Sequence, residues 1–348
     1  MKKLTKQNKL HLATRSRYQL KRTGARKKNI NSHYFATYSN SPLLHASRRQ
    51  RRDKNNEPIT LVAPVNFNLQ FENCVEVIRL VNNLKKLARS GRKLIILDLS
   101  DVVDIREGAI AMLLSVMNEI TKASSVGITG TEPRNADAKA ILEKSGFYKF
   151  VNRRGKETPV KTKNIMRTGI SVTSPNFLSQ EVRNAMETVW GKDGRNPVLR
   201  TIIFEMMRNS CDHAFSRTKD ISWHLSISHD ETNNRVKFSF VDNGAGIINT
   251  LKANALKKVV NFFTGSEDML DTAFKNGIES RTGLEWRGKG LPSIFESFSE
   301  GYVKNLLVIS NDVLLHFDNS KKETLPLSYK GTYYYWEIDK SCKRMCFT

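Results

Sequence analysis

The sequence predicts an α/β protein in two parts, a small open α/β domain over residues 57–150 and a larger α/β sandwich over residues 173–340. A chain of 348 residues is long enough for two domains, and 39% hydrophobic residues suffice for their cores. Beyond a basic N-terminal arm, strand-like and helix-like segments alternate along the chain. These observations together favour layered α/β architecture over an all-helical or all-strand fold.

The net charge of +23 is concentrated in the N-terminal arm. Residues 1–54 contain 16 Lys or Arg and a single acidic residue, Asp53. The arm lacks a sustained apolar period, so residues 1–56 are expected to be disordered when free. Such arms bind phosphate backbones, which predicts a nucleic-acid partner through residues 1–54. A solubilising tail, a contact arm for an acidic protein and an organelle transit peptide are the alternatives.

The four cysteines predict no disulfide framework and no metal site. Cys74, Cys211, Cys342 and Cys346 form no C-x-x-C pair, and no histidine cluster lies near the last two. Cysteines used in this way fit a reducing compartment, and no run of 18 apolar residues is present. We therefore expect a cytoplasmic protein without a membrane partner.

The first domain has the order β-α-β-α-β-α. Short apolar runs rich in β-branched residues predict its strands, and apolar residues at helical spacing predict its helices. The expected strands are Ile59–Val65, Leu94–Leu99 and Val126–Gly130, and the expected helices are Phe71–Leu84, Glu107–Lys122 and Ala136–Lys144. This order predicts a small open sheet with crossover helices.

Three segments of this domain resemble STAS domains, the fold of anti-sigma-factor antagonists. They are the run Leu97–Ile105, the turn Gly130-x-x-Pro133 and the run Ile141–Phe147. Regulatory members of that family carry a phosphorylated Ser or Thr where this chain has Arg106-Glu107-Gly108. The resemblance therefore implies a docking or homodimerisation module, with Ser100 the remaining candidate for modification.

A linker is expected over residues 151–172, because the segment has few large apolar residues. The second domain then begins with two capped helices. Ser174 precedes Pro175, and Asn196 precedes Pro197, which are N-cap and first-turn signals. A short tail, residues 341–348, is expected to follow the domain.

The second of these helices carries Glu205 and Asn209. Residues four apart share a helical face with about 6 Å between their Cβ atoms, so both side chains can act on one ligand. An amide oxygen suits Mg²⁺, which prefers oxygen ligands and keeps several waters. A carboxylate one turn earlier can activate a water molecule as a general base. On its own, such a pair on a mostly apolar helix is more often made of ordinary surface or cap residues.

A strand hairpin, Trp223–Ser228 and Val236–Val241, leads into Asp242-Asn243-Gly244-Ala245-Gly246. Glycines allow the backbone to approach a flat ring closely, and the Asp242 carboxylate can accept a hydrogen bond from an exocyclic amino group. Adenine presents such a group, whereas guanine presents a carbonyl. The turn therefore predicts an adenine reader, although a strand followed by Asn-Gly is also an ordinary turn.

Two further elements complete the candidate site. The run Arg287-Gly288-Lys289-Gly290-Leu291 precedes a helix over Ser293–Phe298, and a glycine-rich turn at a helix N-terminus suits phosphate. After an expected hairpin of Leu306–Ser310 and Val313–Phe317, the last strand holds Gly331 and Thr332. The Thr332 hydroxyl is expected to contact the base.

The four elements, in this order, resemble the GHKL superfamily of gyrase, the heat-shock chaperone, histidine kinases and MutL. The resemblance implies a Bergerat fold, in which helices cover one face of a mixed sheet, and ATP and Mg²⁺ as cofactors. It implies Glu205 as the water-activating base, Asn209 as the metal ligand and residues 248–285 as an ATP lid. The implied nucleotide-binding residues are Asp242, Gly244, Gly246, Arg287, Gly288, Lys289, Gly290, Leu291 and Thr332.

Three functions follow from this resemblance. The first is a conformational switch with slow ATP hydrolysis and an output through the STAS-like domain or the basic arm. The second is a protein serine kinase of the anti-sigma type; a histidine kinase is disfavoured, since the only His-Asp pair, His229-Asp230, lies in a hairpin turn. The third is a non-catalytic nucleotide sensor that binds nucleic acid, against which the presence of both Glu205 and Asn209 counts.

Overall fold

The structure is a computed structural model that describes residues 57–151, 162–170, 175–212, 221–255, 265–277 and 290–344. The chain divides after Glu57, and residues 58–348 form one compact unit. The expected basic arm, part of the expected linker and the last four residues lie outside the described residues. Within the described part, no helix combines the length and the apolar character needed to cross a membrane.

The N-terminal part of this unit is a three-stranded parallel sheet with helices. Its strands β1, β3 and β5 lie in that order, and the pair β2 and β4 is also parallel. The alternation of elements expected from the sequence is confirmed, except that the first strand ends at Val62. The elements are β1 (Ile59–Val62), β2 (Asn66–Phe67), α3 (Asn73–Arg89), β3 (Leu94–Asp98), β4 (Asp104–Ile105), α4 (Glu107–Ala123), β5 (Gly127–Gly130), α5 (Ala136–Lys144) and η1 (Phe147–Lys149).

The C-terminal part is built on a second sheet, in the strand order β6-β7-β8-β10-β9. Every neighbouring pair of these described strands is antiparallel, so the expectation of a mixed sheet is corrected. The strands are β6 (Ile165–Gly169), β7 (Trp223–Asp230), β8 (Arg235–Asp242), β9 (Lys304–His316) and β10 (Lys321–Ile338).

Two expectations about the chain around this sheet are wrong. The range expected as a linker contains the edge strand β6, in which only Met166 is buried, so its sequence carries little strand pattern. The expected hairpin within residues 306–317 is the single strand β9. Asn311 has a φ of 57° within this strand, and the register with β10 shifts beside it; the chain reverses only between His316 and Lys321.

The described helices of this part are α6 (Pro175–Trp190), α7 (Pro197–Asp212), α8 (Ile247–Ala255), α9 (Ser266–Lys275) and α10 (Gly290–Ser299). The Asn196 cap of α7 is confirmed, because its Oδ1 accepts a hydrogen bond from the Leu199 amide at 3.0 Å. The expected Ser174 cap lies outside the described residues. Of the expected lid, helices α8 and α9 are described, and residues 256–264 and 278–285 are not.

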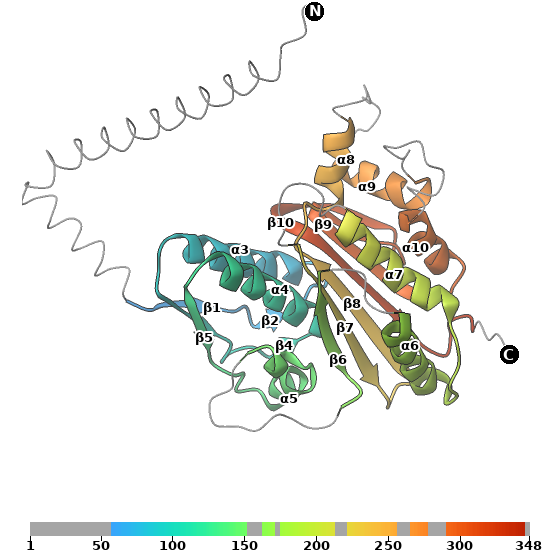
Figure 1. The fold of residues 1–348 in the computed structure, drawn as a ribbon, viewed down its shortest axis with the longest axis horizontal. Helices are drawn as coiled ribbons and strands as arrows, with labels where there is room; N and C mark the ends of the chain where they lie inside the picture. Colours follow the sequence, from blue (N-terminus) through green and yellow to red (C-terminus); the bar gives the residue numbers. More distant parts are fainter. Residues whose placement is uncertain are drawn as a thin grey trace, which may run out of the picture. The chain divides into compact units, whose positions relative to one another are not determined.

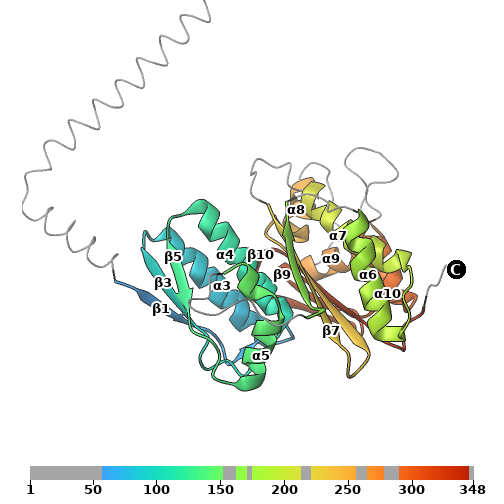
Figure 2. The ribbon, with the colours of Figure 1, turned by 60° about the horizontal axis from the view of Figure 1, so that its bottom comes forward.

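The antiparallel sheet is buried on both faces. Neighbouring residues of one strand belong to different cores, since Tyr333 lies in the core that contains α3 and α4, whereas Tyr334 lies in the core that contains α7 and α10. Figure 2 shows the sheet between these two sets of helices. We call the side of α3 and α4 the back face and the side of α6, α7 and α10 the front face.

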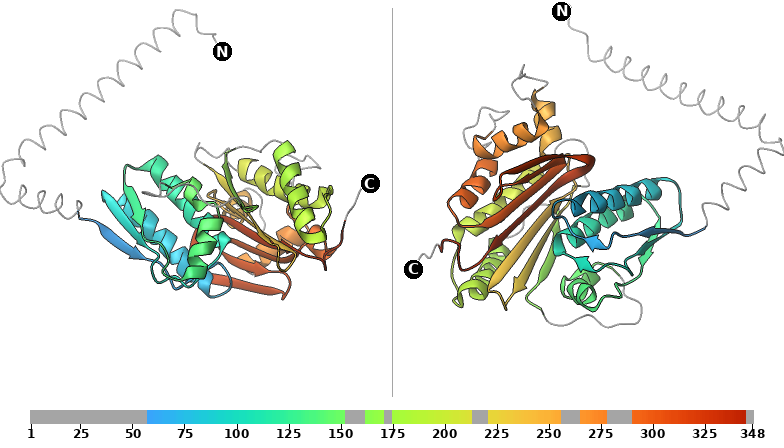
Figure 3. Two further views of the ribbon diagram at one scale, coloured as in Figure 1. Left: turned by 90° about the horizontal axis from the view of Figure 1, so that it is seen from below. Right: turned by 180° about the vertical axis from the view of Figure 1, so that it is seen from behind.

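Helix α4 explains why the back face is closed. Its residues from Gly108 to Val116 are all buried, and a helix that is apolar all round must be covered on every side. Helices α3 and α4 pack against the parallel sheet and also against β7, β8 and β10 of the antiparallel sheet (Figures 1 and 3). The two parts that the sequence presents as separate domains therefore share one core.

Candidate functional site

Asp242 ends strand β8 with a buried carboxylate. This carboxylate accepts hydrogen bonds from the Gly244 amide at 2.8 Å and from the Ser210 hydroxyl at 3.3 Å. Burial raises the pKa of Asp242 to about 6, against the lowering effect of these bonds. A buried acceptor held in one orientation is suited to reading a donor on a ligand.

Thr332 lies directly opposite Asp242 in the ladder between β10 and β8, and it is buried. The residue before it, Gly331, has a φ of 141°, and a Cβ there would lie 2.1 Å from the Asp242 carbonyl oxygen. Only glycine allows the two strands to approach in this way. The structure thus brings together the two residues that the sequence assigns to the base.

Helix α7 directs Glu205 and Asn209 at the start of α10. A Cβ added to Gly290 would lie 2.7 Å from Glu205 Oε2 and 3.3 Å from Asn209 Oδ1. Glu205 also pairs with Arg208, at 3.1 Å between Oε2 and a guanidinium nitrogen. Residues about 80 positions apart in the sequence therefore meet at the N-terminus of a helix, where backbone amides favour negative charge.

Ser210 connects the helix that carries Glu205 and Asn209 with Asp242, and the sequence pattern did not predict this role. It follows Asn209 on α7, is buried, and shares its hydroxyl proton between the Met206 carbonyl at 3.0 Å and the Asp242 carboxylate at 3.3 Å, which is 32 residues away in the sequence. A serine inside an apolar helical run was the available signal. Through this bond α7 is tied to the end of β8.

The turn after Asp242 is held by strand β9. A Cβ on Gly246, whose φ is 83°, would lie 2.3 Å from the Asn311 side chain. Asn311 donates its Nδ2 to the Ala245 carbonyl at 2.9 Å, and Ser310 accepts the Ile247 amide at 2.7 Å. Ser310 and Asn311 were also missed, although two polar residues within an apolar strand are a usable signal.

Of the residues 287–291 that the sequence assigns to phosphate, the structure describes only the last two. Gly290 starts α10 in contact with the Glu205 carboxylate, whereas Leu291 is a buried member of the front-face core. Leu291 therefore has a packing role that its assignment to the ligand did not anticipate. Arg287, Gly288 and Lys289 lie outside the described residues.

The donor set at Asn209 fits a magnesium ion that is held mainly by phosphate and water. The described residues contain no group of three His, Cys, Asp or Glu side chains able to hold a metal by themselves. The Asn209 amide lies beside the Tyr334 hydroxyl, and its Nδ2 is buried without a well-formed hydrogen bond to any described residue. The Asn209 amide oxygen is the kind of single protein ligand that Mg²⁺ accepts.

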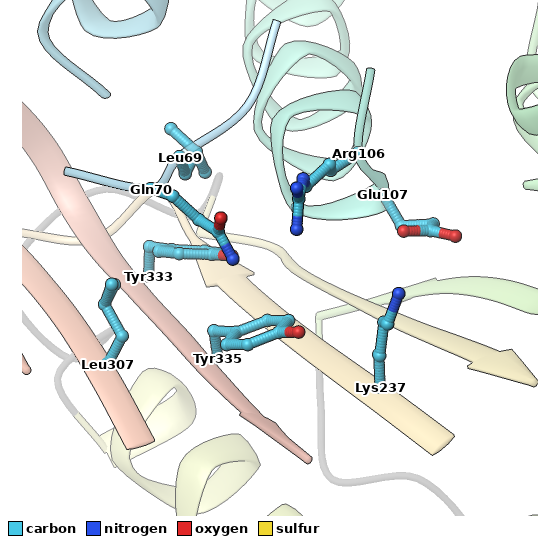
Figure 4. A pocket seen from close by; sticks show the side chains of 9 residues that line it. Leu69, Gln70, Arg106, Glu107, Lys237, Leu307, Tyr333 and Tyr335 are labelled. Carbon is cyan, nitrogen blue, oxygen red and sulfur yellow. The ribbon is translucent and has the colours of Figure 1, made fainter. Parts of the chain in front are cut away.

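A separate small cavity lies on the back face, at the N-terminus of α4 (Figure 4). Arg106, Glu107, Lys237 and Tyr335 are among the side chains around it, and its volume is about 20 Å³. A space of this size holds about one water molecule. The Ser228 hydroxyl donates to Glu107 at 2.6 Å, so the N-terminus of α4 is packed against the antiparallel sheet.

Comparison with the models of known protein families finds no match to this chain, and comparison with curated protein sequences finds none either.

Proposed function

We propose that residues 175–344 bind Mg-ATP, with α7, the turn after β8, the start of α10 and Thr332 around the nucleotide. The observation that carries the proposal is the approach of Gly290 to Glu205 and Asn209, since an added Cβ would lie within 3.3 Å of both side chains. A helix N-terminus that lies against an amide and a carboxylate suits a phosphate group together with its metal ion. The finer fold we propose is a STAS-like layer joined to a Bergerat-like sheet.

Each residue has a distinct role in this proposal. Asp242 accepts the adenine amino group, and Thr332 lies beside it. Gly290 leaves its amide open to a phosphate oxygen. Asn209 holds Mg²⁺, which supplies charge neutralisation of the phosphates when bound.

Glu205 orients and deprotonates the attacking water. Its ion pair with Arg208 keeps the carboxylate in place beside Gly290. In a partly buried setting, a fixed carboxylate of this kind contributes typically 10²- to 10⁴-fold to a proton-transfer step. Hydrolysis is therefore assigned to Glu205, separately from nucleotide binding.

The function we favour is a conformational switch with slow hydrolysis. In the sequence, helices α8 and α9 lie between the turn after β8 and the start of α10. If this segment closes over a nucleotide, these two helices would move first. Nucleic-acid binding through residues 1–54 remains a prediction from charge alone. A partner or second copy bound through the STAS-like layer remains a prediction as well.

A serine kinase acting on its own STAS-like layer is the weaker alternative. The N-terminus of α4 packs on the back face through Glu107 and Ser228, whereas Glu205 and Gly290 belong to the front-face side. A transfer between them within one chain would require the layer to leave the sheet. Phosphorylation of a different protein is not subject to this objection.

The hydrolysis assignment is tested by phosphate release from Mg-ATP. Glu205→Gln is expected to lower the turnover by about 10²- to 10⁴-fold, because the general base is lost, while ATP affinity changes by less than about threefold. Glu187→Gln, on the exposed part of α6, is the matched control and should hydrolyse at the wild-type rate. Wild-type turnover in Glu205→Gln would remove this residue from the mechanism.

A further inference from the structure

Tyr329 connects the back face of the sheet to the candidate nucleotide site. It lies in the irregular stretch of β10 between Thr324 and Thr332, where the pairing with β9 shifts register. Its side chain is fully buried in the core shared with α3 and α4. Lys85 of α3 lies 5.8 Å above its ring, and Ser115 of α4 lies beside its hydroxyl.

The hydroxyl of Tyr329 donates a hydrogen bond to the backbone carbonyl of Asp242, at 3.0 Å. Gly331 leaves room for this bond. A Cβ on Gly331 would lie 2.8 Å from the Tyr329 ring and 2.1 Å from the Asp242 carbonyl oxygen. Burial raises the pKa of Tyr329 far above its usual range, so the hydroxyl keeps the proton that it donates.

Tyr329 also pairs in register with Asn311 of β9. Asn311 holds the Ala245 carbonyl, and Tyr329 holds the Asp242 carbonyl. Two neighbouring side chains thus fix both ends of the glycine turn. Tyr329 differs from Asn311 in that its ring is part of the core formed with α3 and α4.

We propose that Tyr329 is a positioning residue for nucleotide binding, through which the layer of α3 and α4 sets the orientation of Asp242. The physical basis is that the peptide plane of Asp242 fixes the direction of its side chain, and the Tyr329 hydroxyl reaches this plane from the back face. A shift of α3 or α4 would therefore change the affinity for the adenine ring. The inference rests on the proposed function, and it adds a route of regulation to it.

The test compares Tyr329→Phe with Tyr333→Phe in the full chain, by equilibrium binding of Mg-ATP and of Mg-ITP. Tyr333 lies on the same strand and packs in the same core, but its hydroxyl points at Gly108, where an added Cβ would lie 2.3 Å away. Tyr329→Phe removes one buried hydrogen bond, so ATP affinity should fall about five- to tenfold. The preference for ATP over ITP should fall too, because ITP presents a carbonyl in place of the amino group. Tyr333→Phe should change neither quantity by more than about twofold.

A loss of base preference separates positioning from general destabilisation, which would weaken both nucleotides equally. If Tyr329→Phe does not fold, Ser115→Ala removes the hydroxyl beside Tyr329 from α4 and should lower ATP affinity about twofold. Wild-type binding and base preference in Tyr329→Phe, or an equal loss in Tyr333→Phe, would overturn the inference and leave the proposed function standing. Absence of Mg-ATP binding by the wild type would overturn the proposed function itself.

Discussion

The two faces of the antiparallel sheet are both buried, yet they differ in what their contacts do. On the back face, α3 and α4 meet the strands through apolar side chains and scattered polar bonds, such as Asn118 to His224 at 2.9 Å and Asn82 to the Ser328 carbonyl at 2.9 Å. On the front face, aromatic pairs such as Phe238 and Trp336, 5.0 Å apart, form the core. The candidate site lies where this core ends, at Asp242.

The same strands serve two purposes through alternate residues. The back face is packing that fixes the sheet, while the front face ends in polar groups that converge on one place. Substitutions on the back face should therefore cost folding free energy, and substitutions at the site should change ligand binding. Tyr329 is the exception, because it belongs to the back-face core and touches the site.

The largest expected effect comes from truncating neighbouring leucines of β9. Leu314 faces the back core and Leu315 the front core, and both are almost fully buried. Leu314→Ala and Leu315→Ala should each lower the free energy of unfolding by about 3 kcal/mol, as measured by urea denaturation. If Leu314→Ala costs less than about 1 kcal/mol while Leu315→Ala shows the full loss, α3 and α4 do not cover this sheet and the shared core is wrong.

A smaller effect, of opposite sign, is expected at Asp242. Its pKa is raised from 3.8 to about 6 in the folded protein, so between these values the folded state keeps a proton that the unfolded state has lost. Stability should therefore fall as the pH rises from about 4 to about 6 and stay level above. Asp242→Asn has no carboxylate charge to bury. The variant should therefore be more stable than the wild type by roughly 2 kcal/mol at pH 7, and this gain should vanish near pH 4.

Asp98→Asn is the control for this measurement. Bonds from the Thr131 hydroxyl and the Ser100 amide hold the pKa of Asp98 at about 2, below its usual value. Its stabilising effect is present above pH 4 and is lost as the pH falls through about 2, so Asp98→Asn should be less stable than the wild type at both pH 7 and pH 5. A gain for Asp98→Asn, or a loss for Asp242→Asn at pH 7, would contradict the assignment of the buried charge.

Local patterns in the sequence predict most of the elements, and they fail where tertiary contacts decide. The α3 and α4 periodicities and the Asn196 cap depend on neighbours within one turn or two, and these elements are observed. Strand β6 has one buried residue, and its position depends on pairing with β7, which no local pattern records. The positive φ of Asn311 likewise goes with a bond to Ala245, 66 residues away, which no local pattern records.

The candidate site divides in the same way. Glu205, Asn209, Asp242 and Thr332 are visible in the sequence because their own types and spacing suggest chemistry. The residues that hold them, such as Ser210 and Tyr329, act through bonds to distant parts of the chain. An ordinary serine on a helix and an ordinary tyrosine on a strand give no sign of such bonds until the fold is known.

Adenine binding by Asp242 is tested by the equilibrium dissociation constant for Mg-ATP, measured by calorimetry for the wild type, Asp242→Asn and Asp98→Asn. We expect saturable binding by the wild type and by Asp98→Asn, whose side chain lies at the end of β3 in the other layer. For Asp242→Asn we expect a loss of affinity of roughly 10- to 100-fold, the cost of one hydrogen bond to a buried charged group. Wild-type affinity in Asp242→Asn would contradict the assignment of this carboxylate to adenine.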